Sequence, residues 1–316
     1  MTRRIFGRIA GAMLTLAAPG LASADSVLYK YNVVTTGDFT QNSHVDYNTF
    51  IGGNLKGSGG VFSMSNNFPV GPGLTIAGTA VGSSNQQVNS NRNLVVSSAG
   101  AAGTVHLNGG SLVIDSTLAT QAAQISQELQ NDSIAFKALA TNQAGPVVAN
   151  NGQFTFTVNA ATAVNGVAVF NINGALLSSN SVQNGLSLAG DFASVSSIII
   201  NVTGTSITTN GNFNGAWNGA PISAKTLWNF ADATTLTLNN NFQGAILAVN
   251  AAVTHSSVST DGSLFAKSLV SNGEIHKSLY SGYVPSPSVV PEPASLVMAG
   301  IGAAFAMVTA RRRARA

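Results

Sequence analysis

Short runs of β-branched and apolar residues, separated by Gly, Asn and Ser, dominate this chain from Val27 onward. Residues 154–158 and 236–238 alternate apolar with polar side chains, which predicts strands with one buried face. Residues 197–202 and 245–249 are mainly apolar throughout, which indicates strands covered on both sides. Because Gly- and Asn-rich turn signals recur every several positions, the pattern limits the chain to a fold of many short strands.

One segment, from residue 116 to about 142, departs from this pattern. Its apolar residues recur at helical spacing, at Leu118, Ala122, Ile125, Leu129, Phe136 and Leu139. Asp115 or Ser116 supplies a capping residue in front, and Gly145-Pro146 follows. The segment therefore predicts one long helix packed against the sheet.

The strand-forming residues favour one architecture over another. Asn in turns, with Thr and Val in short strands, is typical of a parallel β-helix, in which like side chains stack and Asn amides form ladders. No strict repeat period is present, and a two-sheet β-sandwich fits the spacing nearly as well. The long helix after a few strands favours a mostly β chain built as a right-handed parallel β-helix-like domain with one packed helix.

Composition excludes some partners. Charged residues make up 8% of the chain, against about 25% in an ordinary soluble domain. Seven of the 14 Lys and Arg residues lie in the two end segments, so the stretch 25–291 carries seven bases against ten acids, a net charge of −3. With no basic patch, we expect no nucleic-acid partner. The chain has no Cys, so its core must be stable without disulfides.

The segment 1–24 has the layout of a secretory signal peptide. Arg3, Arg4 and Arg8 precede an apolar stretch over 9–21, and Ala22-Ser23-Ala24 supplies small residues at a cleavage site. We expect export by the Sec machinery and cleavage by signal peptidase between Ala24 and Asp25.

The last residues form a second targeting segment. A linker over 285–290 leads to Pro291, Glu292 and Pro293, and an uncharged apolar run follows over 294–310. As a helix this run spans about 25 Å, close to the hydrocarbon thickness of a membrane, so it predicts a transmembrane helix. The basic cluster behind it should stay in the cytoplasm, and it consists of Arg311, Arg312, Arg313 and Arg315.

The order of these three parts over 291–316 resembles the PEP-CTERM sorting signal of exported bacterial proteins. The resemblance implies an exosortase-type processing enzyme as a partner. It also implies an intermediate anchored in the inner membrane and a final location at the cell surface or in the extracellular matrix.

Several phrases in the body of the chain resemble the choice-of-anchor A domain. They are Gly37-Asp38-Phe39, Gly52-Gly53-Asn54, Leu227-Trp228-Asn229-Phe230, residues 242–248 and Gly273-Glu274-Ile275-His276. In order they cover most of 33–283, so we assign 25–284 to this domain. Residues 49–51 and Val249 depart from the family pattern. The resemblance implies a β-helical, adhesin-like surface domain with no established enzymatic chemistry and no catalytic residues to transfer.

The candidate catalytic and metal-binding residues are sparse. None of the four histidines, His44, His106, His255 and His276, lies in an HExxH or HxH motif, so no metal or cofactor site is predicted. Glu274 and His276 are alternate residues of one strand and share a face, which predicts a hydrogen-bonded structural pair.

Paired carboxylates would be needed by a glycosidase. Asp38 with Asp46, and Asp232 with Asp261, are candidate pairs without supporting motifs, so no catalytic residue is assigned.

Two further residue types are candidate binding groups. Thr-x-Thr pairs, which could form an ice-binding face, occur at Thr155/Thr157, Thr203/Thr205 and Thr235/Thr237 without a common period. Of the two tryptophans, Trp228 is predicted to lie in the core, whereas Trp217 lies in a loop and could stack on a sugar ring.

Together these features predict an exported cell-surface or matrix protein that is adhesive or structural, with extracellular polysaccharide as a candidate ligand. The alternative is a secreted polysaccharide-processing enzyme on the same β-helix scaffold. Ice binding is the least favoured interpretation.

Mass spectrometry of the mature protein tests both processing sites. We expect a product that begins at Asp25 and ends near Pro291-Glu292-Pro293, because each segment carries its own cleavage signal. A product that keeps the terminal arginines would instead indicate a permanent membrane anchor.

Overall fold

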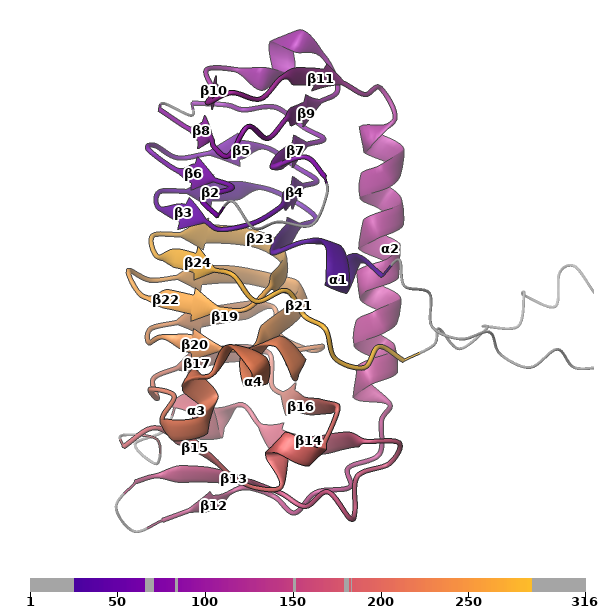
Figure 1. Cartoon of the computed structure of the whole chain (residues 1–316), viewed down its shortest axis with the longest axis vertical. Coiled ribbons are helices and arrows are strands. Elements are labelled where there is room, and N and C mark those ends of the chain that lie inside the picture. The colour runs from indigo at the N-terminus through magenta and orange to yellow at the C-terminus, as the bar shows by residue number, and fades with distance from the viewer. Residues whose placement is uncertain are drawn as a thin grey trace, which may run out of the picture. The chain divides into compact units, whose positions relative to one another are not determined.

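The computed structural model describes residues 26–65, 71–82, 85–149, 152–178, 182 and 184–285. Over these residues the chain winds into stacked coils whose strands pair in parallel with the coils above and below (Figure 1). This is a parallel β-helix, as the sequence predicts. The alternative β-sandwich is wrong, because sandwich sheets are antiparallel.

The first face of the β-helix is a run of ten neighbouring strands. In pairing order they are β11 (Leu112–Ile114), β9 (Leu94–Val96), β7 (Leu74–Ile76), β4 (Thr49–Ile51), β1 (Val33–Thr35), β23 (Leu264–Ser271), β21 (Ala245–His255), β18 (Thr226–Asn229), β16 (Ser197–Thr203) and β14 (Val167–Asn173).

The second face continues from the two longest of these strands. The register of β21 with β23 shifts between Ala248 and Ala252, and the later halves of both strands belong to the second face. They pair there with β2 (Phe39–Gln41), β5 (Leu55–Lys56), β19 (Thr235–Leu238) and β17 (Ser206–Thr209).

The third face is a separate sheet of seven short strands. In pairing order they are β10 (His106–Leu107), β8 (Gln87–Val88), β6 (Val61–Phe62), β3 (His44–Val45), β24 (Glu274–His276), β22 (Ser259–Asp261) and β20 (Phe242–Gln243). A small sheet at one end of the stack holds β12 (Val147–Val148), β13 (Phe154–Val158) and β15 (Leu186–Gly190).

The described part of the chain has few helices. They are α1 (Val27–Lys30), α2 (Leu118–Lys137), α3 (Ala175–Ser178) and α4 (Ala220–Lys225), with 3₁₀ turns η1 (Ala99–Ala102), η3 (Phe192–Ser194) and η4 (Gly215–Asn218). Where the sequence predicts a helix over about 116–142, α2 begins at Leu118 and ends at Lys137.

The order of the coils is discontinuous along the chain. From β1 the chain builds coils toward β11 at one end, and α2 then runs beside the stack toward the opposite end (Figure 1). From β14 the later coils build back until β23 pairs with β1 and β24 pairs with β3. We call this junction between the first and last coils the seam.

Coils of unequal length explain the missing repeat period. Val33 pairs with Thr49 after a short coil, whereas a much longer coil separates Ile198 from its partner Thr226. Turns and short helices absorb the difference, and strand register is kept because each slip would turn buried side chains outward.

The interior of the coils is apolar and, toward the later coils, aromatic. Phe156, Phe213, Trp217, Trp228 and Phe242 contact one another there, mostly edge to face. Trp228 is a core residue, as predicted. Trp217 is fully buried as well, which removes it as a sugar contact.

A second apolar layer covers the outside of the first face. Val34, Phe50 and Ile199 of the sheet belong to one buried cluster with Leu129 and Phe136 of α2. This cover explains why the strands of the first face are continuous apolar runs in the sequence.

A ladder of buried amides fastens α2 to this face. Asn229 donates to the Asn201 side chain and to the backbone carbonyl of Ser133, each at 2.9 Å. Asn201 donates to the carbonyl of Phe136 at 2.9 Å and to Asn171 at 3.2 Å. The ladder satisfies polar groups inside an otherwise apolar interface.

No helix in the described part of the chain is long and apolar enough to cross a membrane. The predicted signal peptide over 1–24 and the predicted transmembrane helix over 294–310 lie outside the described residues, as do the sorting motif and the arginine cluster.

Asp132 on α2 is an ionisable group in an unfavourable place. It is 5% exposed, and its Oδ2 atom has no hydrogen-bond partner. Burial, followed by the nearby charge of Glu128, raises the pKa of Asp132 to about 7. The folded state therefore binds this proton more tightly than the unfolded state does.

Replacing Asp132 by Asn tests this. Because the folded pKa is raised, the contribution of Asp132 to the stability of the wild type should fall as pH rises from about 4 through 7, by on the order of 2–4 kcal/mol, whereas the lowered pKa of His255 contributes in the opposite direction in both proteins. Asp132→Asn cannot ionise and should flatten that slope in urea unfolding curves measured across this range. Asp191→Asn, an exposed control, should keep it. An unchanged slope in Asp132→Asn would contradict the assignment.

Candidate functional site

The outward side chains of the second face form two aligned rows across neighbouring parallel strands. The first row is Thr208, Thr237, Thr254, Val270, Thr40 and Lys56. The second row is Ser206, Thr235, Ala252 and Ser268. All ten are exposed or half-buried. We call these two rows the threonine array.

Strand alternation produces the array. Leu236, Leu238, Val253 and Leu269 point into the coil interior and are buried, so the residues between them point outward. Within the array, the Thr235 hydroxyl donates to Ser206 Oγ at 3.0 Å. Apart from Lys56 at one end, the array carries no charged side chain.

Asparagine ladders hold the coils in register beside the array. Asn239 donates to Asn210 Oδ1 at 3.0 Å, and Asn42 donates to Asn272 Oδ1 at 2.8 Å. Side-chain ladders of this kind tie each coil to the next and favour a flat sheet.

The sequence identified only part of the array. Of the three Thr-x-Thr pairs, Thr235/Thr237 belongs to it, whereas Thr155/Thr157 lies on β13 in the small end sheet. Thr203 ends β16, and Thr205 follows it. Reasoning from sequence missed Thr40, Thr208 and Thr254, because the unequal coils give aligned residues no constant spacing.

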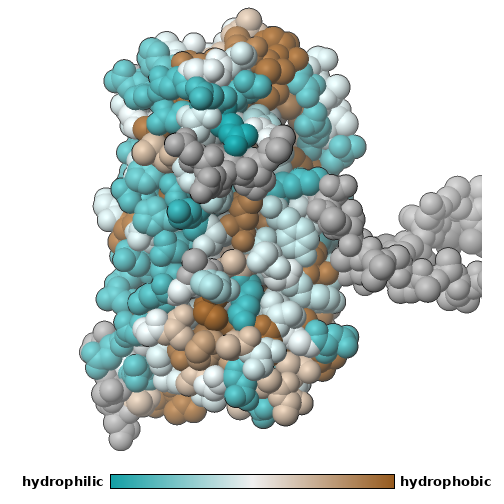
Figure 2. All heavy atoms as spheres, viewed as in Figure 1, coloured by the Kyte–Doolittle hydropathy of each residue, from teal (hydrophilic) through white to brown (hydrophobic). Residues whose placement is uncertain are grey.

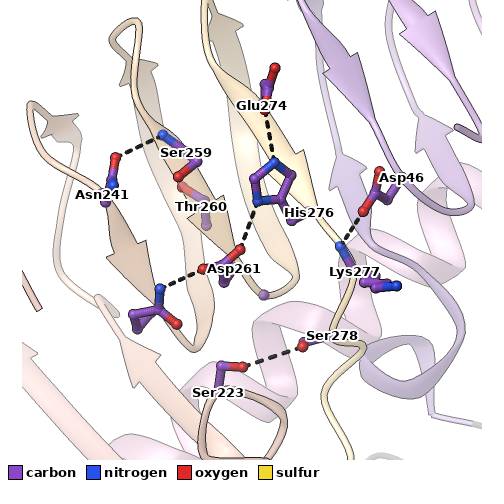
Figure 3. A network of polar contacts seen from close by, with 12 residues as sticks. Asp46, Ser223, Asn241, Ser259, Thr260, Asp261, Glu274, His276, Lys277 and Ser278 are labelled. Carbon is purple, nitrogen blue, oxygen red and sulfur yellow. Dashed lines mark hydrogen bonds and ion pairs between the residues drawn. The ribbon is translucent and has the colours of Figure 1, made fainter. Parts of the chain in front are cut away.

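The third face carries a cluster of titratable groups. His276 lies between two carboxylates (Figure 3): its Nδ1 is 2.8 Å from Asp261 Oδ1, and its Nε2 is 2.9 Å from Glu274 Oε2. Asp261 also accepts from the Gln243 amide, and Asp46 accepts from the backbone N–H of Lys277 at 2.8 Å. The predicted Glu274–His276 pair thus forms part of a longer network.

Two pKa values in this network move in opposite directions. Burial alone lowers the pKa of His276, but its hydrogen bonds to Glu274 and then to Asp261 outweigh burial and raise it overall. The hydrogen bond from His276 lowers the pKa of Glu274. The network therefore favours the protonated, positively charged form of His276 between the carboxylates of Glu274 and Asp261.

His44 joins this cluster from a distant part of the sequence. Its Nδ1 is 3.5 Å from Glu274 Oε1, and ligand atoms of His44, Glu274 and His276 all lie within 4.8 Å of one another. Reasoning from sequence missed His44 because it stands near the start of the domain and Glu274 near its end, and only the seam brings β3 beside β24.

The other two histidines are apart from this cluster. His255 is buried in the coil interior, where it pairs with Ser271 at 2.9 Å, and burial followed by the charge of His276 lowers its pKa to about 4. His106 is exposed on β10.

The candidate carboxylate pairs are engaged elsewhere. Asp38 forms an ion pair with Lys56 at 2.6 Å, and Asp232 forms one with Lys137 of α2 at 2.7 Å. Asp46 and Asp261 belong to the third face. Each of these carboxylates has a structural partner of its own, so the enzyme alternative gains no support from them.

Shallow polar pockets lie along the third face, where hydrophilic residues gather over β3, β6, β22 and β24 (Figure 2). One, of about 500 Å³, is lined mainly by amides, from Asn212, Asn214, Asn218, Asn241 and Gln243, together with Phe213 and Asp261. A neighbouring pocket of about 380 Å³ shares Asn218, Gln243 and Asp261 and includes His276.

The solved structures that the chain matches include ice-binding proteins. One is from the Antarctic ascomycete Antarctomyces psychrotrophicus, with 13% identity over 81% of this chain and 97% of that chain and a TM-score of 0.39. Another is a domain of ice-binding protein 1 of Shewanella frigidimarina, with 16% identity over 82% and 98% and a TM-score of 0.42. At these TM-scores the fold assignment rests on the strand pairing. No curated protein matches the chain significantly.

Family models match both parts of the sequence. Residues 24–277 match the ice-binding-like adhesive domain, and residues 289–313 match the PEP-CTERM protein-sorting motif. The first match is to a different family from the choice-of-anchor A domain that the sequence phrases resemble, so it does not show that domain. An adhesive domain followed by a sorting motif indicates an exported cell-surface or extracellular protein. The chain belongs to the family of ice-binding-like adhesive domains.

Proposed function

We propose that this protein is an exported adhesin that binds ice through the threonine array of its second face. The family match supports an adhesive domain, and the sorting motif supports a place outside the cytoplasm. The array itself is the observation that carries the choice of ligand. Because of the array, we rank ice as a ligand above the polysaccharide that the sequence favours.

The array has the regularity that a solid surface requires. Adjacent parallel strands lie about 4.8 Å apart, and alternate residues along a strand lie about 6.6 Å apart, so two rows make a two-dimensional grid. Its members on β17, β19 and β21 are threonine and serine, apart from Ala252. A regular grid matches a repeating ligand better than a single soluble molecule, which prefers a concave site.

The side chains of the array suit ordered water. Threonine presents a methyl group and a hydroxyl together, and its branched Cβ restricts χ1. Little rotamer entropy is therefore lost on binding. Charged groups hold water in their own hydration shells, and the array carries one only at Lys56, which is held by Asp38.

The targeting segments complete the proposal. The protein would leave the cytoplasm by the Sec route, lose residues 1–24 at Ala24–Asp25, and be held by the helix over 294–310 with its arginines inside. An exosortase would then act near Pro291-Glu292-Pro293. Resemblance to the choice-of-anchor A domain would place it among surface proteins with interchangeable C-terminal anchors.

A second candidate ligand is extracellular polysaccharide. The observation that favours it is the amide-lined pocket on the third face, where Asn241, Gln243 and Asp261 converge. Amides and carboxylates supply the donors and acceptors that sugar hydroxyls need.

Substitution in the array tests ice binding. Thr254 is exposed at the middle of the first row, so Thr254→Tyr should lift the flat face away from ice and remove most partitioning into a growing ice front. Its thermal stability should change by no more than about 0.5 kcal/mol, because the site is at the surface. Thr157→Tyr, an exposed threonine on β13, is the matched control and should bind ice as the wild type does.

Pull-down with insoluble polysaccharides separates the two ligands. If ice binding survives Thr254→Tyr, or falls equally in Thr157→Tyr, the array is not the binding surface. Polysaccharide retention that is lost in Asn241→Ala but kept in Thr254→Tyr would support the second candidate instead.

A further inference from the structure

The cluster of His44, Glu274 and His276 is placed by the topology and not by a local motif. Val45 pairs with Ile275 across the seam, which sets His44 of the first coil beside Glu274 of the last. His276 projects from the same strand face as Glu274, two residues on. Three donor side chains thus converge from two strands that lie at opposite ends of the domain sequence.

The hydrogen bonds of His276 leave room for a cation. A neutral imidazole carries one N–H, but both ring nitrogens of His276 face carboxylate oxygens, at 2.8 and 2.9 Å. When Nδ1–H donates to Asp261, the lone pair of Nε2 faces Glu274. In the imidazolium a second proton on Nε2 satisfies Glu274, and in the neutral ring a metal ion bound by Nε2 and the Glu274 carboxylate takes the place of that proton. A carboxylate that holds the outer nitrogen of a ligating histidine is a recurrent support of metal sites.

The distances are near those of a tetrahedral site. Donors bound to Zn²⁺ at about 2.0–2.1 Å lie about 3.3 Å from each other. His276 Nε2 is 2.9 Å from one Glu274 oxygen, and His44 Nδ1 is 3.5 Å from the other. Small side-chain rotations bring the His44 and His276 donors, which lie within 4.8 Å, to the same ion.

We propose that His44, Glu274 and His276 bind one divalent transition-metal ion of the zinc class across the seam, with Asp261 as the outer support of His276. Two imidazoles and one carboxylate select zinc-like ions over Ca²⁺, which takes six to eight oxygen ligands. Glu274 is about half exposed, so water fills the fourth position. The site is separate from the threonine array, and ice binding does not depend on it.

The location gives the metal a structural consequence. The first coil is joined to the last by strand pairing and by Asn32, whose side chain donates to the carbonyls of Gly262 and His276 at 3.0 and 3.1 Å. An ion bound by His44 of the first coil and by Glu274 and His276 of the last coil would link these two coils across the seam. Because the ligands meet only in the folded state, metal binding adds to folding stability.

Calorimetric titration of the full chain with Zn²⁺, after treatment with a chelator, tests the proposal. We expect one ion per chain, no competition by Ca²⁺, and a Zn²⁺-dependent rise in Tm. His44→Ala and Glu274→Gln should each abolish binding and the rise in Tm, and Asp261→Asn should weaken binding about tenfold. His106→Ala is the matched control, because His106 is exposed on the same sheet, and should bind as the wild type does.

Circular dichroism in the presence of chelator must show that each variant is folded. If His44→Ala does not fold, the loss of Zn²⁺ binding is tested with Glu274→Gln alone. Folded wild-type protein without saturable Zn²⁺ binding would overturn the proposal. So would equal loss of binding in His106→Ala and His44→Ala, since that would indicate nonspecific binding to surface histidines.

Discussion

Parallel backbone pairing between coils is the interaction on which everything else in this domain depends. Strands within the stack are held by the coil on either side, and at the seam β1 pairs with β23, so the first coil and the last coil of the chain stabilise one another. Non-local pairing of this kind closes long loops at a cost in conformational entropy. That cost is offset only when the whole stack has formed. The rows of the second face and the cluster of the third face are both products of this register.

The three faces differ because their outer surfaces meet different surroundings. The first is covered by α2 and is apolar on both sides, with the Asn201 and Asn229 amides paired inside the interface. The second meets solvent and presents uncharged side chains apart from Lys56. The third meets solvent too, and it gathers amides, carboxylates and histidines. A single winding pattern therefore places the helix-covered face, the threonine array and the histidine–carboxylate cluster on different sides.

Much of the fold could be predicted because its signals are local. Strand alternation at residues 154–158, the apolar run at 197–202 and the helical spacing from Leu118 to Leu139 each depend on neighbours a few residues away. The candidate sites depended on contacts that no local pattern records. Thr40 and Thr254 meet in one row, and His44 meets Glu274, through coils whose lengths vary. Trp217, in a polar loop sequence, is buried by aromatic contacts with Phe156 and Phe213.

The sequence by itself determined the class of fold and the PEP-CTERM sorting motif, because residue periodicity, turn chemistry and an apolar segment beside arginines act through local physics. Only the tertiary structure decided which polar residues stand together. Coil length sets which positions align, and turns of different size change that length without leaving a period in the sequence. For the same reason, a threonine row and a histidine–carboxylate cluster became visible only once the coils were stacked in register.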